Sequence, residues 1–199
     1  MEIQKINGQT TFLPAAETPL SANVVFIQCG GETWIFDVGC SDEAAEKINS
    51  VEGKKNIVLS HFHPDHTGNI ERVSYDELYA GAFTCKRFKT GTTVNEHMFF
   101  ESGIHLFPLP SGHAKGSIGL EYKNCAFLGD AVYSMKKNGR IAYNAELLKK
   151  EIAVLKSLDA ERFFISHSEP FGKTKAEVIE ELERIYMLFD KHDPYIFLD

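Results

Sequence analysis

Three histidines and one aspartate are crowded into residues 60–69, whose sequence is SHFHPDHTGN. Only 8 of the 199 residues are histidine, so composition alone does not account for this cluster. Imidazole nitrogens and carboxylate oxygens are the donors that bind zinc and iron in proteins. The segment therefore predicts a metal site rather than a solvated polar turn. The candidate ligands are His61, His63, Asp65 and His66.

The element that must position these donors is the apolar run at residues 56–59, which directly precedes them. Side chains alternate along a strand, so His61 and His63 are expected to project to the same side. Asp65 and His66 would then follow from the turn and the first residues of a short helix. A loop anchored by a strand in this way holds its donors in a fixed geometry.

Four donors are too few for two metal ions, and further candidates follow other predicted strands. The apolar runs 104–107, 126–128 and 162–165 each end shortly before one such residue, and these residues are His113, Asp130 and His167. Loops beyond strand ends commonly carry function. The combined pattern predicts that these three side chains join the first cluster.

Short apolar runs alternate with helical patterns along the rest of the chain. Strands are predicted at 24–27, 33–36, 56–59, 104–107, 118–122, 126–128 and 162–165, and Gly30-Gly31 favours a turn after the first. Helices are predicted from Ser41 to about Ile48, from Asn144 to Leu158, and from Thr174 onward. No linker or repeat interrupts this order, so we predict one domain over residues 1–199 with layered α/β or α+β architecture.

Composition bounds the class of protein. Hydrophobic residues make up 43% and charged residues 25%, which is ordinary globular usage. A formal net charge of −7 argues against a broad nucleic-acid-binding face. No apolar run approaches a membrane span, and the first residues do not resemble a signal peptide. Four cysteines without a CxxC pair favour free thiols, so we expect a cytoplasmic protein that does not bind membranes.

The order HxHxDH, GH, GD and SH resembles the metallo-β-lactamase superfamily, from about Asn23 to His167. Residues 36–39, FDVG, also fit, because the family usually has an aspartate and a glycine after an early strand. The resemblance implies an α+β fold, the αβ/βα sandwich, in which two mixed β-sheets pack face to face with helices on the outer faces. The metals would lie at one edge, where loops meet.

The resemblance also implies a role for each donor. His61, His63 and His113 would bind the first metal, and Asp65, His66 and His167 the second. Asp130 would bridge both metals, as would a water or hydroxide, and Asp65 and Asp130 are the residues assigned to catalysis. Asp37 would orient a ligand or the loop beneath it. The implied cofactors are two divalent ions, with zinc favoured over iron or manganese.

Differences between this sequence and individual branches of the superfamily reduce the number of activities to consider. A bridging aspartate at Asp130 disfavours the classical zinc β-lactamases. Glyoxalase II enzymes share the seven ligands but append a helical glutathione-binding domain, whereas only about 30 residues follow His167. The tRNA-processing nucleases are longer and carry an RNA-binding arm, and flavodiiron proteins usually have glutamate in place of His63. Lactonases remain compatible in their ligands.

These ligands imply hydrolysis. Two divalent cations lower the pKa of a shared water, so that a metal-bridging hydroxide can attack a carbonyl or phosphoryl centre. Two cations, two aspartates and one hydroxide leave about one positive charge at the site. We therefore expect a small, anionic thioester, ester, lactone or phosphodiester as substrate.

Two other functions stay open. A persulfide dioxygenase-like oxidoreductase would bind a single iron at His61, His113 and Asp130, and metal analysis would distinguish one iron from two zinc ions. A binding or regulatory protein on the same scaffold is disfavoured, because such proteins usually have a broken ligand set. Oligomeric state is not predicted, and the apolar residues 195–198 must be buried against this chain or a partner.

The rim of the site is less constrained by the sequence. Tyr133 and Lys115 are candidate substrate contacts, with a buried structural tyrosine and an exposed surface lysine as the alternatives. Residues 79–102 and 133–144 are expected to determine substrate specificity. The sequence does not predict whether they form a lid over the site. The first of these segments holds a small basic patch at residues 86–89, for which a solvated helix face is favoured over a mobile loop. His97, His105 and His192 are interpreted as structural.

Overall fold

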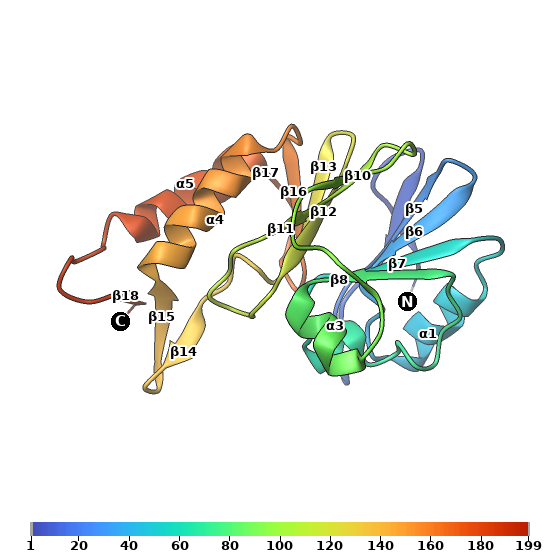
Figure 1. The fold of residues 1–199 in the computed structure, drawn as a ribbon, viewed down its shortest axis with the longest axis horizontal. Helices are drawn as coiled ribbons and strands as arrows, with labels where there is room; N and C mark the ends of the chain where they lie inside the picture. Colours follow the sequence, from blue (N-terminus) through green and yellow to red (C-terminus); the bar gives the residue numbers. More distant parts are fainter. Residues whose placement is uncertain (1, 199) are drawn as a thin grey trace.

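Two mixed β-sheets form the body of this computed structural model, which describes residues 2–198 (Figure 1). The first sheet has the strand order β1-β2-β5-β6-β7-β8-β9. Its strands β1 to β6 pair antiparallel, whereas β6, β7, β8 and β9 pair parallel. Their bounds are Gln4–Lys5, Thr10–Leu13, Val24–Cys29, Glu32–Phe36, Lys55–Leu59, Glu77–Ala80 and Thr92–Thr93.

The second sheet has the strand order β10-β11-β12-β13-β16-β17. Only β13 and β16 pair parallel in it. The bounds are Met98–Phe99, Ile104–Pro108, Ile118–Tyr122, Cys125–Gly129, Arg162–Ile165 and Gly172–Thr174. A short hairpin, β3 (Ala16–Glu17) with β4 (Leu20–Ser21), stands apart from both sheets.

The apolar residues of the strands are divided between three layers of core. Along β5, Val25 and Ile27 face the second sheet, and they share a cluster with Leu106, Leu120 and Phe127. The alternate residues Val24 and Phe26 pack with the helices on the outer side. Because side chains alternate along a strand and both faces are covered, these strands read as continuous apolar runs. The sandwich expected from the sequence is confirmed.

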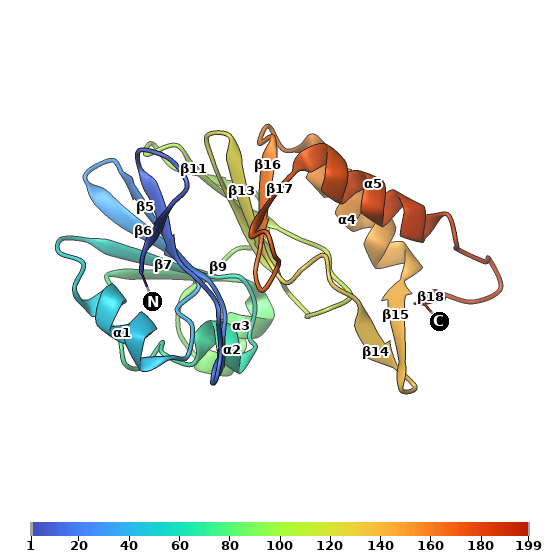
Figure 2. The same cartoon turned by 180° about the vertical axis from the view of Figure 1, so that it is seen from behind.

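Helices cover the outer faces of both sheets. The first sheet is covered by α1 (Asp42–Asn49) and α3 (Ala82–Phe88), and the second by α4 (Ala145–Ser157) and α5 (Lys175–Tyr186), which lie side by side in Figure 2. A single-turn helix, α2 (Pro64–Thr67), belongs to the histidine-rich segment. No helix within residues 2–198 combines the length and the apolar character that crossing a membrane requires.

Helix starts follow the predicted capping residues. The Ser41 hydroxyl accepts from the Ala44 N–H at α1, and Asn144 Oδ1 accepts from the Leu147 N–H at α4. Thr174 forms a capping box with Glu177 at α5. These side chains satisfy N–H groups that the helix itself leaves unpaired.

A third, three-stranded sheet lies beyond the sandwich. It has the order β14 (Met135–Lys137), β15 (Arg140–Asn144) and β18 (Tyr195–Leu198). Its last strand contains the apolar residues near the C-terminus, and β18 pairs antiparallel with β15 of the same chain. The Ile196 side chain is accordingly buried in the cluster that α4 and α5 cover.

The structure bears on three expectations from the sequence, which concern the cysteines, the two segments near the site and the isolated histidines. All four cysteines are free thiols, and three of them are buried, as expected. The segment 79–102 contains β8, α3, β9 and β10, and the segment 133–144 is mostly the β14–β15 hairpin. His97 and His105 form a hydrogen bond of 2.8 Å, and His105 Nδ1 lies 2.8 Å from the Glu121 carboxylate, which supports their structural interpretation.

Candidate metal centre

All seven predicted donors lie at one edge of the sandwich, where the loops after four strands meet. His61, His63, Asp65 and His66 follow β7, and His113 lies between β11 and β12. Asp130 follows β13 immediately, and His167 comes two residues after β16. The donors therefore come from the ends of strands in both sheets.

The donor atoms form two adjacent groups. One contains His61, His63 and His113, and the other contains Asp65, His66, Asp130 and His167. Within each group the donor atoms lie within 4.8 Å of one another. Asp130 touches both groups, since its Oδ2 lies 3.3 Å from His66 Nε2 and 3.5 Å from His113 Nε2. This position between the groups suits the bridging role that the resemblance implies.

Separations between individual donors match those around a bound ion. His113 Nε2 lies 3.2 Å from His63 Nδ1 in the first group. Asp65 Oδ2 lies 3.0 Å from His167 Nε2 and 3.4 Å from His66 Nε2 in the second. Ligands about 2.1 Å from one tetrahedral ion are roughly 3.4 Å apart, so both groups have the dimensions of a metal site.

Unpartnered buried atoms show that the donors fit metal ions. His61 Nε2, His66 Nε2 and Asp130 Oδ1 are buried and accept or donate no hydrogen bond. Buried polar atoms in native proteins nearly always have a partner, because leaving one unsatisfied is costly. A divalent ion in each group would satisfy these atoms. Nitrogen and oxygen donors of this kind suit zinc, iron and manganese.

A buried network behind the donors determines which ring nitrogens face the centre. Asp37 accepts from His66 Nδ1 at 2.7 Å, and it also accepts from both the backbone N–H and the hydroxyl of Ser60 at 2.8 Å. Because the Ser60 hydroxyl donates to Asp37, its oxygen is left to accept from His61 Nδ1 at 3.0 Å. In both imidazoles, Nδ1 thus has an acceptor for its proton, and Nε2 is directed to the metal site.

One glycine makes this network sterically feasible. Gly129 ends β13 with a φ of +58°, a conformation that residues with a Cβ rarely adopt. A Cβ at this position would lie 2.6 Å from both Cβ and Oγ of Ser60. The close approach of β13 to Ser60 brings Asp130 next to the donors that follow β7.

The electrostatics of the donors follow from their burial and neighbours. Burial lowers the pKa of His61 far below its usual range, and the surrounding imidazoles lower it further. Burial also acts to lower the pKa of His66, but the carboxylates of Asp37 and Asp130 outweigh it and raise this pKa to about 10. For Asp65, burial is outweighed by the hydrogen bond from His167, so its pKa is lowered.

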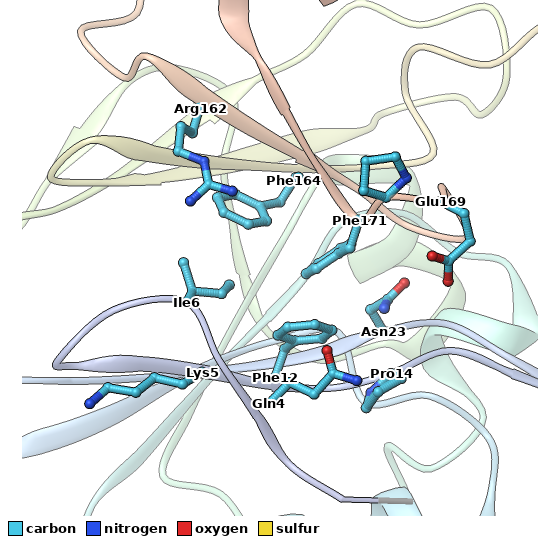
Figure 3. A pocket seen from close by; sticks show the side chains of 12 residues that line it. Gln4, Lys5, Ile6, Phe12, Pro14, Asn23, Arg162, Phe164, Glu169 and Phe171 are labelled. Carbon is cyan, nitrogen blue, oxygen red and sulfur yellow. The ribbon is translucent and has the colours of Figure 1, made fainter.

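The loop that carries His167 is held from both sheets. His167 itself has a φ of +63°, and its backbone N–H donates to Asn23 Oδ1 at 3.1 Å. The preceding Ser166 N–H donates to the carbonyl of Gly129 at 3.0 Å. Asn23 also lines a separate cavity of about 300 Å³, where it lies near Glu169 and the aromatic ring of Phe171 (Figure 3).

The two candidate substrate contacts differ in their surroundings. The Tyr133 hydroxyl donates to the Ser166 carbonyl at 2.8 Å, and burial raises the pKa of this phenol to about 12. The hydroxyl hydrogen of Tyr133 therefore forms a bond that holds the His167 loop in place. Lys115 is exposed two residues after His113, and its Nζ lies 5.9 Å from the ring centroid of Phe83.

Several residues next to the centre were not predicted from the sequence. Ser60 and Asn23 contact the ligand network. The Phe62 ring lies beside His63, and Phe83 and Arg87 lie against Phe62. The contact between Ser60 and Asp37 could have been predicted. Ser60 follows β7 and Asp37 follows the neighbouring parallel strand β6, so the two residues lie at the same edge of the sheet. The contacts of Asn23 and Phe83 depend on segments distant in sequence.

Comparison with known proteins finds sequence similarity to one protein family and to one curated protein. A family model described as "Metallo-beta-lactamase superfamily" matches residues 18–75. The hydroxyacylglutathione hydrolase of Buchnera aphidicola subsp. Schizaphis graminum (strain Sg) is 31% identical over 112 residues, covering 50% of this chain and 42% of that protein. The match thus spans less than half the length of this relative.

Solved structures share the fold over almost the whole chain. The metallo-β-lactamase SMB-1 bound to 2-mercaptoethanesulfonate has a TM-score of 0.70 and 14% identity, with 94% of this chain and 95% of that one covered. A chemotaxis sensor, ODP, described with a peroxy diiron species, has a TM-score of 0.67 and 14% identity, with 94% of each chain covered. At these identities the likeness concerns the fold alone.

Proposed function

This chain belongs to the metallo-β-lactamase superfamily, and on that premise we propose that it is a metal-dependent hydrolase with a dinuclear centre. The first ion would be held by His61, His63 and His113, and the second by Asp65, His66 and His167. Asp130 would contact both ions. Zinc is the metal we propose, with a small anionic thioester, ester, lactone or phosphodiester as the substrate.

The convergence of seven donors in two groups, with three of their atoms buried and unpartnered, is the observation that carries this proposal. A solvated polar cluster would not bury such atoms away from both solvent and hydrogen-bond partners in the protein. The relative named a hydroxyacylglutathione hydrolase supports hydrolysis as the reaction class.

When bound, two divalent ions would supply an activated water and polarise the carbonyl or phosphoryl oxygen of the substrate. The residues of this chain then have separate tasks. Asp65 and Asp130 provide the negative charge that offsets the cations, and Asp130 sets the spacing between the groups. Asp37 and Ser60 keep His66 and His61 in the tautomer that presents Nε2 to the centre.

The experiment that tests the proposal combines metal analysis with an assay. We expect protein purified without added metal to hold about two zinc ions per chain, and to lose hydrolysis of model thioesters, lactones and phosphodiesters after chelation. His61→Ala should lower both the metal content and the activity. Lys149→Ala, on the exposed side of α4, is the matched control and should change neither.

Other outcomes contradict parts of the proposal. One iron per chain, with oxygen uptake in the presence of persulfides, would favour the oxidoreductase alternative instead. Protein that binds no metal even when zinc or iron is offered would overturn the proposal altogether.

A further inference from the structure

We infer that Phe62, Phe83, Arg87 and Lys115 form a recognition surface for substrates that join an apolar group to an anionic group. We call these four residues the aromatic–cationic platform. The inference rests on the proposed function, because it names the substrate class of that site. It is drawn from the way in which α3 and the His113 loop meet beside the first group of donors.

The two aromatic rings extend the metal centre outward. Phe62 lies between His61 and His63 in the chain, and its ring centroid is 4.8 Å from that of His63. The Phe83 ring, on α3, lies 4.8 Å from the Phe62 ring. Phe83 is 38% exposed, so one side of this aromatic pair is open to a ligand. An acyl or aryl group next to the metals would therefore contact rings rather than water.

Two cations flank the rings. Arg87 lies one helical turn after Phe83, and its Cζ is 5.8 Å from the centroid of the Phe62 ring. Lys115 Nζ is 5.9 Å from the centroid of the Phe83 ring. Both distances are within the range of cation–π contacts, which hold each charge over a ring.

Neither of these charges is already neutralised. Both side chains are exposed, and within residues 2–198 neither Arg87 nor Lys115 forms an ion pair with a carboxylate. By contrast, Lys150 on α4 is paired with Glu146. In a chain with a net charge of −7, two unpaired cations beside a metal centre favour an anionic partner.

Close backbone packing fixes the platform relative to the metal ligands. A Cβ at Gly81, just before α3, would overlap the carbonyl oxygen of Gly116 in the His113 loop. Gly116 has a φ of +73°, and a Cβ there would lie 3.2 Å from Cβ of Phe83. The start of α3 therefore rests directly on the loop that carries both His113 and Lys115. A recognition surface needs this kind of fixed placement next to the reacting groups.

The test uses two chromogenic esters of equal length that differ in one charge. These are 4-nitrophenyl hexanoate, which is neutral, and the mono-4-nitrophenyl ester of adipic acid, which ends in a carboxylate. We expect Arg87→Gln and Lys115→Gln each to raise KM for the adipate ester roughly two- to fivefold while leaving the hexanoate ester unchanged. Phe83→Ala should lower kcat/KM for both esters, because the apolar contact is common to them.

Lys86→Gln is the matched control for these variants. Lys86 is the exposed neighbour of Arg87 on α3, and in the described part of the chain the cation–π contacts with the two rings come from Arg87 and Lys115 rather than from Lys86. Lys86→Gln removes one positive charge from the same helix as Arg87→Gln does. An effect of net charge alone would therefore be equal in the two variants. The expected result is an unchanged KM for both esters.

Failure of this inference can be separated from failure of the proposed function. If Arg87→Gln and Lys115→Gln change both esters alike, or neither, the platform does not select anions, although metal-dependent hydrolysis stands. If the wild-type protein hydrolyses neither ester, calorimetric titration with 4-phenylbutyrate and its neutral amide tests the platform directly. The acid should bind more tightly than the amide, and the two Gln variants should reduce this difference. Equal affinities would overturn the inference.

Discussion

Asp37 accepts a hydrogen bond from Nδ1 of His66 at 2.7 Å, and both side chains are completely excluded from solvent. The contact joins the end of β6 to the turn after β7, in the interior rather than at the open edge of the site. It holds the ring so that Nε2 faces Asp65 and Asp130. A carboxylate in this position also increases the basicity of the ligand.

Asp37→Asn should therefore weaken metal binding at the second group of donors by roughly ten- to a hundredfold. Asparagine keeps the size of the side chain but replaces one acceptor oxygen with an N–H donor, which faces the Ser60 and His66 donors. Competition with a chromophoric chelator measures the zinc affinity. Asp42→Asn, at the exposed start of α1, is the control and should leave the affinity unchanged. Equal affinities for both variants would contradict the role of Asp37.

Glu151 on α4 should make the stability of the protein depend on pH. Its side chain is 1% exposed, Oε1 has no hydrogen-bond partner, and burial raises its pKa well above the usual value of 4.5. Above pH 4.5 the unfolded chain releases this proton while the folded chain retains it, so raising the pH favours unfolding. The stability that protonated Glu151 allows is complete below pH 4.5 and is lost progressively toward the raised pKa of the folded state.

Glu151→Gln should remove this dependence. The variant should be more stable than the wild type, and its advantage should grow above pH 4.5 by up to about 1.4 kcal/mol per pH unit. Urea unfolding at pH 5, 7 and 8 measures it. Glu146→Gln on the same helix removes an exposed carboxylate that pairs with Lys150, so its effect should not grow in this way. A constant difference for Glu151→Gln across this range would contradict the prediction.

Gly129→Ala should cost both stability and metal-dependent activity. The substitution forces a Cβ into Ser60 in addition to placing alanine at a positive φ. Gly139→Ala separates these two effects, because Gly139 has a φ of +78° with no atom within 4 Å of its Cβ position. We expect Gly139→Ala to cost roughly 1–2 kcal/mol with normal activity. Gly129→Ala should cost about 1–3 kcal/mol more and lower the zinc content.

Tyr133→Phe should affect stability more than catalysis. The variant loses the hydrogen bond to the Ser166 carbonyl, which is worth about 1 kcal/mol. Tyr143→Phe, which removes a hydroxyl bonded to the Val132 carbonyl, is the control for losing a buried tyrosine hydroxyl. We expect kcat/KM within about threefold of the wild type for both variants. A loss near a hundredfold for Tyr133→Phe alone would instead indicate a donor that acts on the reacting oxygen.

The donors could be predicted because each follows a strand that its own sequence specifies. The run at 56–59 forms β7, and the donors behind it occupy one turn and α2, where local chain geometry determines their directions. His113, Asp130 and His167 come from other strands. Their positions after strand ends grouped them with the first cluster, and the family resemblance then assigned each of them a role. The strand and helix patterns predicted a layered fold, and the family resemblance identified that fold as the αβ/βα sandwich.

Contacts between distant segments could not be predicted in this way. The basic patch on α3 was interpreted as a solvated helix face, and Arg87 is indeed exposed, but its position over Phe62 depends on how α3 packs against the His113 loop. The burial of the apolar segment near the C-terminus was predicted, but its partner β15 was not. Periodicity describes which face of an element is apolar, and it does not identify what covers that face.

The donors are far apart along the chain, so the two sheets must dock before the metal-binding site is complete. Residues that follow strands of the first sheet supply part of each donor group, and residues that follow strands of the second sheet supply the rest. Neither half of the molecule can build the complete centre before the two sheets have docked. In a refolding experiment, tight zinc uptake would therefore report the docking of the two layers, and a chain divided between them would regain that uptake only when its two parts associate.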